Sequence, residues 1–353
     1  MTRLVLLGGG HAHALVLLKS RDAFPESLDV TLVTPYPVHT YSGMVPGVVA
    51  GHYKIPEAQI DLSRLAERAG VRLLLGSVRS LDADAKIVFL EDGSRVPYDI
   101  ASLNTGSLPA MTAPGSAEHA LGVKPFETFM QHWETRGLSA RRIAVAGAGA
   151  AGIEMAMAIR HRLPSAKVFL YSDRPMFSGA LAARLARALE RCGVELRSGT
   201  AVAALEPGPV VVTQRGREAC DLVLWTAGAA PQPWLRQSGL QTDVAGFVLV
   251  DPALRSVSHP DVFAAGDCAT LRDAPHPKSG VYAVRHAPVL AANLANLLQG
   301  KPMRDYAPQP RQLALISCGG KYAIASRGGW SAEGAWAWRW KDWLDRRWIA
   351  RFR

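Results

Sequence analysis

The fold is decided by the stretch Ile143-Ala144-Val145-Ala146-Gly147-Ala148-Gly149-Ala150-Ala151-Gly152. An apolar strand pattern runs directly into Gly-x-Gly-x-x-Gly, and helix-favouring residues follow up to Leu163. Glycine permits a tight turn and lets the backbone approach a pyrophosphate at a helix N-terminus. The strand before the motif and the helix after it distinguish a dinucleotide-binding unit from an ordinary glycine-rich turn.

The same arrangement occurs earlier in the chain. Leu4-Val5-Leu6-Leu7 leads into Gly8-Gly9-Gly10-His11-Ala12-His13. Further matches follow in the same order: a helix that stops at a glycine before a strand (65–73 and 188–196), a hairpin-like stretch (86–96 and 210–220), and a closing strand and turn (98–106 and 220–228). The repeat predicts an α/β fold with two Rossmann-like dinucleotide-binding domains.

The two turns differ in detail. His13 stands at the third glycine position of the first turn, and Thr34 ends the next strand where an acid is expected. In the second copy, Asp173 follows Gly152 by 21 residues and favours the ribose of NADH. Arg174 is its neighbour and suits the 2′-phosphate of NADPH, so the choice between NADH and NADPH stays open.

Composition narrows the class of protein. The 353 residues carry 40 Lys and Arg against 30 Asp and Glu, and the net charge of +10 fits nucleic acid, anionic cofactors or an anionic membrane surface. Nucleic acid is disfavoured because the basic residues outside the C-terminal end are scattered. The four cysteines form no C-x-x-C pair or zinc spacing, which indicates a reducing, cytoplasmic compartment. No apolar run reaches the roughly 20 residues of a membrane-spanning helix.

A third element carries a resemblance to a known family. The apolar stretch from Asp261 to Ala269 contains Gly266-Asp267, and with the two turns it resembles the two-dinucleotide-binding-domain flavoproteins, the pyridine nucleotide-disulfide oxidoreductase family. The resemblance implies that this stretch returns to the first domain and that Asp267 binds the ribityl chain of FAD. It implies an FAD domain over 1–108 and 245–325 and an NAD(P)H domain over 109–244.

The resemblance also supplies a set of cofactor-binding residues. They are Gly8, Gly10, His11, Ala12, Thr34, Pro46, Val78, Thr105, Gly106, Gly266, Asp267, Val281, Gly147, Gly149, Gly152, Asp173 and Gly228.

Within this family the chain looks like a type II NADH dehydrogenase, which passes electrons from NAD(P)H through FAD to a quinone. A redox cysteine pair is absent, which excludes the disulfide-reductase branch. Glu154, just after the third glycine, matches a Glu of the dehydrogenase branch, although it also suits an ordinary first helical turn. The branch's Ala-Gln pair is missing near Lys278, so Lys278, Tyr282 or Arg285 is expected to replace it. Glu154, Lys278 and Tyr282 are the predicted catalytic residues.

Alternatives remain. Cys318 stands where sulfide:quinone oxidoreductases have a cysteine, which allows a sulfur or selenium substrate, although no partner cysteine is evident. His11-Ala12-His13, 41–47 and 50–53 resemble flavoproteins associated with selenide, water dikinase. A non-catalytic flavin-binding partner protein is the third possibility. The spacing of His11, His13, His39 and His52 implies no metal geometry, so we predict no metal.

The C-terminal segment, residues 326–353, has a different composition. Residues 330–353 hold six of the nine tryptophans, with six cations against three acids. A helix after Gly334 would carry Trp336, Trp340 and Trp343 on one face. Tryptophan and cations together favour the membrane–water interface, so we expect peripheral attachment to the inner face of the cell membrane. Packing on the body or in a homodimer is the alternative.

Overall fold

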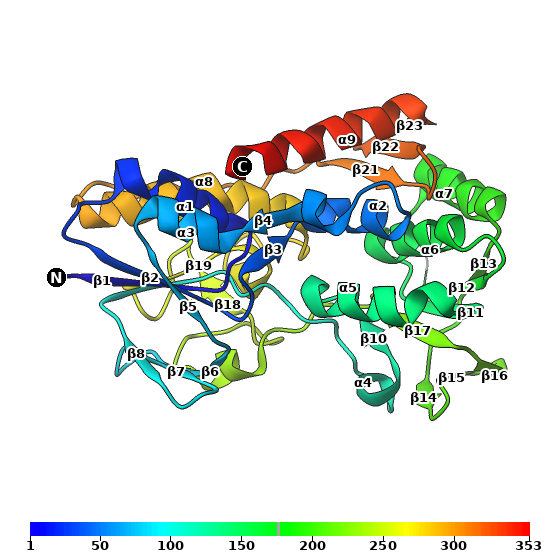
Figure 1. Ribbon diagram of the computed structural model, residues 1–353, viewed down its shortest axis with the longest axis horizontal. Coiled ribbons are helices and arrows are strands. Elements are labelled where there is room, and N and C mark those ends of the chain that lie inside the picture. Colours follow the sequence, from blue (N-terminus) through cyan, green and yellow to red (C-terminus); the bar gives the residue numbers. More distant parts are fainter. Residues whose placement is uncertain (175–176) are drawn as a thin grey trace.

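The computed structural model describes residues 1–174 and 177–353. Two five-stranded parallel sheets lie side by side along the length of the molecule (Figure 1). The first has the order β19 (Val262–Ala264), β9 (Ile100–Leu103), β1 (Arg3–Leu7), β2 (Asp29–Thr34), β5 (Arg72–Leu75). The second has the order β10 (Leu121–Gly122), β17 (Leu222–Trp225), β11 (Arg142–Ala146), β12 (Lys167–Ser172), β13 (Val194–Ser198). The predicted α/β fold with two Rossmann-like units is confirmed.

Each glycine turn sits between a central strand and the helix that follows it. In the first half, β1 leads into α1 (His11–Ala23), and in the second half β11 leads into α6 (Ala150–Arg162). Helices α3 (Leu62–Ala69) and α8 (Gly280–Leu298) join α1 over the first sheet, and α7 (Gly179–Cys192) joins α6 over the second (Figure 1). The central strands are apolar along their length because helices and loops bury both faces of a parallel sheet.

The predicted helix ends and hairpins are present in both halves. Helix α3 ends at Gly70 and helix α7 at Gly193, and both glycines adopt the left-handed conformation that closes a helix. The antiparallel meanders are β6 (Val78–Asp82), β7 (Ile87–Leu90) and β8 (Arg95–Pro97) in the first half, and β14 (Ala204–Glu206), β15 (Val210–Thr213) and β16 (Gly216–Ala219) in the second. The long-period repeat in the sequence is therefore a repeat in the fold.

Strand β19 returns to the first sheet, as the resemblance implied. It pairs with β9 in parallel, with Val262 opposite Ala101. The short turn of 3-10 helix at Gly266–Cys268 follows, and β20 (Ala269–Leu271) then pairs with β18 (Val248–Val250). The remaining elements are β3 (Val38–Thr40), α2 (Val45–Val49), β4 (Gln59–Asp61), α4 (Ser116–His119) and α5 (Phe126–Thr135).

The C-terminal part forms a third sheet and the expected helix. Strands β21 (Leu313–Ser317), β22 (Ala323–Arg327) and β23 (Trp330–Gly334) are antiparallel, and α9 (Ala335–Ile349) follows directly. Ile316, Cys318 and Ile324 face the core of the second half, whereas Ala323 and Ala325 pack on Ala337 of α9. The predicted C-terminal segment began at residue 326, but β22 runs through that residue. The C-terminal unit therefore begins earlier in the chain, with β21.

Helix α9 lies across the helices of both halves (Figure 1). Trp348 and Ile349 join the core of the first half, while the start of α9 rests on the third sheet. Within residues 1–174 and 177–353, no helix combines the length and the apolar character that crossing a membrane requires.

Candidate functional site: two phosphate-binding turns and a charged cavity under the last helix

The first glycine turn forms a cradle that side chains would fill. Gly8 has φ +90°, and a Cβ there would lie 2.6 Å from the carbonyl oxygen of Asn104. A Cβ at Gly10 would lie 2.3 Å from Asn104 Oδ1, which accepts a hydrogen bond of 3.0 Å from the backbone N–H of Ala12. Asn104, which sequence analysis did not single out, therefore caps α1 and leaves the earlier amides of the turn for a ligand.

His13 replaces the third glycine with a hydrogen-bonded side chain. It is fully buried, and its Nδ1 lies 2.6 Å from the carbonyl oxygen of Gly8 while Nε2 lies 2.8 Å from Ser102 Oγ. A carbonyl oxygen only accepts, so Nδ1 carries the proton. Burial lowers the pKa of His13 to about 4, and the ring is neutral at pH 7. The first turn is thus held by an imidazole.

Two buried polar atoms beside this turn have no partner among the described residues. They are Nε2 of His11, whose side chain begins α1, and Oγ1 of Thr105, which follows β9. His11 is only 7% exposed, and its Nδ1 lies 3.2 Å from Nε2 of His39. Unsatisfied buried polar groups cost free energy unless a ligand meets them. Both were predicted to bind a cofactor, and the cradle and the unpaired atoms fit an FAD.

Asp267 lies in a cluster that joins the two halves. Its Oδ2 lies 2.7 Å from Nζ of Lys124 and accepts a 3.1 Å hydrogen bond from Ser107 Oγ. The preceding residue, Gly266, donates its backbone N–H to Nδ1 of His286 at 3.0 Å. Lys124 was not predicted, because a lone lysine in a loop carries no pattern that assigns it to a site.

The second turn follows the glycine pattern in full. Gly147 has φ +108°, and a Cβ at Gly152 would lie 1.8 Å from the Gly147 carbonyl oxygen, so only glycine fits there. Thr226 Oγ1 donates to that same carbonyl at 2.8 Å, in the place that His13 Nδ1 takes in the first half. Gly228 has φ +66° in the loop after β17.

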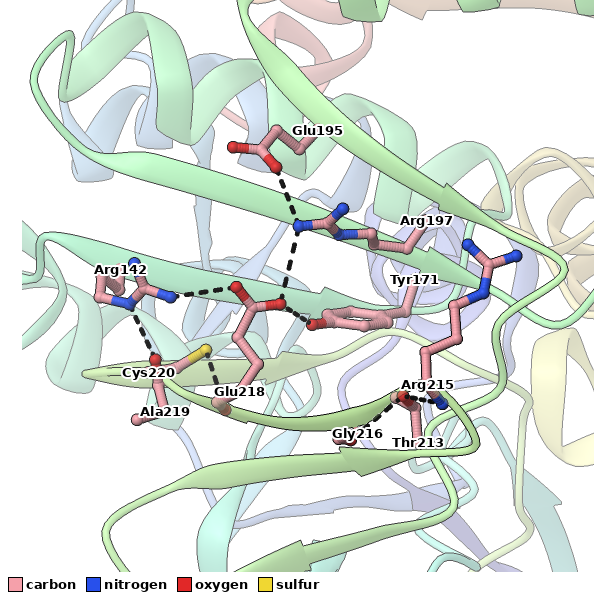
Figure 2. Close-up of polar contacts among 10 residues, drawn as sticks. All are labelled: Arg142, Tyr171, Glu195, Arg197, Thr213, Arg215, Gly216, Glu218, Ala219 and Cys220. Carbon is pink, nitrogen blue, oxygen red and sulfur yellow. Dashed lines mark hydrogen bonds and ion pairs between the residues drawn. The ribbon is translucent and has the colours of Figure 1, made fainter.

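Asp173 lies exposed at the end of β12, with its carboxylate 3.9 Å from Arg174. Close to it, a network ties β12 to the neighbouring meander (Figure 2). Tyr171 OH donates to Glu218 at 2.7 Å, and Arg142 binds the other oxygen of Glu218 at 3.0 Å. These groups are paired with one another, whereas the side chains of Asp173 and Arg174 are exposed. The choice between NADH and NADPH stays a prediction.

The predicted catalytic residue Glu154 lies partly buried on α6. Its Oε1 accepts a 2.8 Å hydrogen bond from the backbone N–H of Ser317, which ends β21. Burial raises the pKa of the Glu154 carboxyl, and the charge of Lys341 on α9 opposes that rise. The pKa of Glu154 therefore depends on the positive charge of Lys341.

Lys341 and Asp345 bring a buried ion pair to the same region. Lys341 Nζ lies 2.8 Å from Asp345 Oδ2 and 2.6 Å from the carbonyl oxygen of Gly43, and the two side chains are 12% and 8% exposed. They border a cavity of about 10 Å³, the volume of a single water. Its lining also includes Pro46, His52, Tyr53, Ser317 and Trp338. From the sequence, α9 was interpreted through its tryptophans and its net charge, and the signal that was missed is a Lys–Asp pair at i, i+4 on the opposite face.

Lys278 and Tyr282 lie elsewhere. Lys278 Nζ donates to the carbonyl oxygen of Ala269 and to Thr270 Oγ1 at 2.7 Å, and it lies 4.0 Å from the ring centre of Phe247. Tyr282 stacks on His276 with ring centres 3.9 Å apart. None of the hydrogen bonds or ion pairs of the described residues joins Glu154, Lys278 and Tyr282, so their catalytic roles stay predictions.

The other predicted cofactor residues have varied positions. Thr34 is buried at the end of β2, Gly106 has φ +68° after β9, Val78 begins β6, and Val281 is exposed in the first turn of α8. Among the described residues no group of three or more histidine, cysteine or acidic side chains is arranged to hold a metal ion.

The cysteines are thiols in apolar surroundings. Cys318 has Cys192 as its neighbour, since Cys192 Sγ donates to the Cys318 carbonyl oxygen at 3.4 Å. Cys318 packs in the core of the second half, and burial raises its pKa to about 12. A thiol that stays protonated at neutral pH is a poor nucleophile.

The outer face of α9 is apolar and basic. Trp336, Trp340 and Trp343 are 42%, 38% and 52% exposed, and the rings of Trp336 and Trp340 stack. The guanidinium of Arg347 lies 5.1 Å from the ring centre of Trp343. The predicted tryptophan face is present.

Comparisons with known proteins agree with this architecture. The family model described as Pyridine nucleotide-disulphide oxidoreductase matches residues 2–287. The NADH dehydrogenase-like protein YutJ of Bacillus subtilis is 24% identical over 335 residues, which cover 92% of this chain and 91% of that protein. An NADH dehydrogenase-like protein of Mycobacterium tuberculosis is 30% identical over 304 residues, which cover 77% and 74%. The fold is similar to that of the sulfide:quinone oxidoreductase of Aquifex aeolicus, with a TM-score of 0.80, 17% identity, and coverage of 100% and 92%.

Proposed function

The chain belongs to the pyridine nucleotide-disulphide oxidoreductase family, and from that premise we propose that it passes electrons from NAD(P)H through FAD to a quinone at a membrane surface. FAD and NAD(P)H are the cofactors typical of this family. FAD, when bound, accepts a hydride from NAD(P)H and passes the electrons on to an acceptor, while the protein supplies binding, orientation and electrostatics.

Each half would hold one cofactor. The turn at Gly8 and Gly10, with His11, Thr105 and Asp267, would hold FAD, and the turn at Gly147, Gly149 and Gly152 would hold NAD(P)H. In this proposal residues 1–108 and 245–325 serve FAD and residues 109–244 serve NAD(P)H. The unpaired buried atoms of His11 and Thr105 support the assignment of FAD to the first half.

The observation that carries the acceptor side is the pair of charged groups beneath α9. Lys341 lines the small cavity there together with Pro46, and Glu154 lies near enough for the charge of Lys341 to oppose the rise in its pKa. A buried cation stabilises negative charge that develops on a quinone oxygen, and a carboxyl with a raised pKa is a better proton donor than an ordinary one. These residues would replace the Ala-Gln pair that the sequence lacks.

The two faces of α9 suit an acceptor that arrives from a membrane. Lys341 and Asp345 face inward, and Trp336, Trp340 and Trp343 face outward on the same helix. A helix of this kind lies in the headgroup region of an anionic bilayer. The cavity would then lie directly below the bilayer surface. Membrane attachment at the inner face of the cell membrane is part of this proposal.

A sulfur or selenium compound is the second candidate acceptor or donor. The resemblance to flavoproteins associated with selenide, water dikinase and the fold of a sulfide:quinone oxidoreductase favour it. The raised pKa of Cys318 and its position in the core of the second half weigh against thiolate chemistry. Quinone is therefore the first candidate.

The test separates the two half-reactions. Protein reduced anaerobically with NADH is mixed with a short-chain quinone, and flavin reoxidation is followed by stopped flow. We expect Glu154→Gln to keep its FAD and to slow reoxidation at least about a hundredfold, the low end of an acid–base contribution. Cys318→Ala should reoxidise at the wild-type rate. If Cys318→Ala loses turnover and Glu154→Gln does not, the sulfur candidate replaces the quinone.

A further inference from the structure

The connection between the two halves sends three side chains, close together in the sequence, back onto the first half. Lys124 lies just after β10 of the second sheet, and Glu127 and Thr128 lie in the first turn of α5. Lys124 reaches Asp267, Glu127 Oε1 accepts the backbone N–H of Thr40 at 2.8 Å, and Thr128 Oγ1 lies 3.0 Å from the hydroxyl of Tyr36. We call residues 124–128 the clasp.

Only the first contact of the clasp meets a residue expected to bind FAD. Lys124 Nζ binds both Asp267 Oδ2, at 2.7 Å, and Ser107 Oγ, at 3.0 Å. The side chain of Asp267 is 10% exposed and that of Lys124 is 29% exposed, so water screens this pair only in part. The charge of Lys124 also reaches His11 at the N-terminus of α1, where it helps to lower the pKa of the imidazole.

Lys278, the lysine predicted to be catalytic, is engaged with Ala269 and Thr270. The cation that lies on Asp267 is Lys124 instead. From this geometry we infer that Lys124 is a positioning residue for FAD. It holds the Asp267 carboxylate in place for the ribityl chain, and its positive charge balances the negative charge of Asp267 when the flavin gains electrons. This inference rests on the proposed function, because it assumes that FAD binds at Asp267.

Loss of the Lys124 charge should shift the flavin potential in a defined direction. Removing one partner of a partly buried ion pair leaves the other charge uncompensated. In Lys124→Met the bare carboxylate of Asp267 would lie beside the flavin and disfavour its reduced, anionic form. The reduced flavin would then bind less tightly relative to the oxidised one. A tenfold change in that ratio corresponds to about 30 mV for a two-electron couple.

The experiment compares the midpoint potential and FAD retention of the purified holoprotein and its variants. We expect Lys124→Met to lower the potential by about 30 mV, for the tenfold ratio above, and to weaken FAD retention at least tenfold. Lys124→Arg should stay close to wild type. The double variant Lys124→Met/Asp267→Asn removes both charges and should return the potential toward wild type. Lys86→Met is the matched control, because it breaks another Lys–Asp pair, to Asp261 at 2.6 Å.

Each outcome decides the inference. If Lys124→Met has the potential of Lys86→Met, or if the double variant departs from wild type as far as Lys124→Met does, the inference is wrong. If Lys124→Met loses its FAD before the midpoint potential can be measured, FAD retention decides instead. The double variant must then retain FAD better than Lys124→Met, and equal loss of FAD from the two variants contradicts the inference. If the wild type itself retains no FAD, the proposed function fails and not merely the role of Lys124.

Discussion

His13 Nδ1 lies 2.6 Å from the carbonyl oxygen of Gly8, so an imidazole closes the first glycine turn where the second has Gly152. In the second half, the hydroxyl of Thr226 donates a hydrogen bond to the equivalent carbonyl oxygen, that of Gly147. The two halves therefore hold the same turn with different groups. The first half thereby has a titratable side chain at the centre of its glycine turn.

Replacing His13 with alanine should destabilise the protein. Both hydrogen bonds of the buried ring are lost and a cavity remains, which together cost about 3 kcal/mol of unfolding free energy. Chemical denaturation of wild type and His13→Ala measures this difference. His132→Ala, at a partly exposed position on α5, should change it by less than about 0.5 kcal/mol. Equal stabilities of His13→Ala and wild type would show that the ring does not hold the turn.

The same ring makes the protein sensitive to acid. Burial lowers the folded-state pKa of His13 to about 4 from the ordinary 6.5. The neutral ring is the stable form in the fold, so its contribution is fully present above pH 6.5 and is lost as the pH falls toward 4. The shift corresponds to about 3 kcal/mol. Between pH 6.5 and 4, the unfolding free energy should fall more steeply for wild type than for His13→Gln, and parallel curves would refute this.

The buried pair of Lys341 and Asp345 should matter most when only one partner is removed. Lys341→Met leaves the Asp345 carboxylate buried and unpaired, which costs about 3–5 kcal/mol. We expect α9 of this variant to become sensitive to limited proteolysis. The double variant Lys341→Met/Asp345→Leu removes both charges and should be more resistant than the single one. A double variant that is cleaved faster than Lys341→Met would contradict the buried-pair argument.

The outward face of α9 should bind anionic vesicles. Changing Trp336, Trp340 and Trp343 to serine should abolish flotation with vesicles that contain phosphatidylserine, since these rings supply the exposed apolar surface. Arg347→Glu should weaken binding and its dependence on salt, because each surface cation contributes about 1 kcal/mol. Glu91→Gln, at an exposed position in the β7–β8 turn, is the control. If the triple variant floats as wild type does, or forms fewer dimers than wild type, the face serves a different contact.

The sequence predicted the features that depend on local patterns. The glycine turns, the left-handed helix ends at Gly70 and Gly193, and the tryptophan face of α9 each follow from residue spacing. Strand β19 was placed by resemblance, and its pairing with β9 confirms that placement. The limits of the C-terminal unit were not evident, because β22 crosses residue 326 without a change in composition.

Local sequence patterns did not predict the contacts between distant parts of the chain. Lys124 meets Asp267 across 143 residues, and Glu154 meets Ser317 across 163. Nothing local distinguishes these side chains from surface lysines and helix acids. Asn104 was missed for the same reason, since its cap on α1 depends on the strand order that brings β9 beside β1.

The central claim is that this chain transfers electrons from NAD(P)H to FAD. Anaerobic titration of the purified, FAD-loaded protein with NADH and, separately, with NADPH tests it most directly. The account predicts that at least one of them bleaches the flavin absorbance stoichiometrically, and that Gly152→Val, whose side chain would collide with the Gly147 carbonyl, retains FAD but is not bleached. Bound flavin that stays oxidised with both nucleotides would contradict the account.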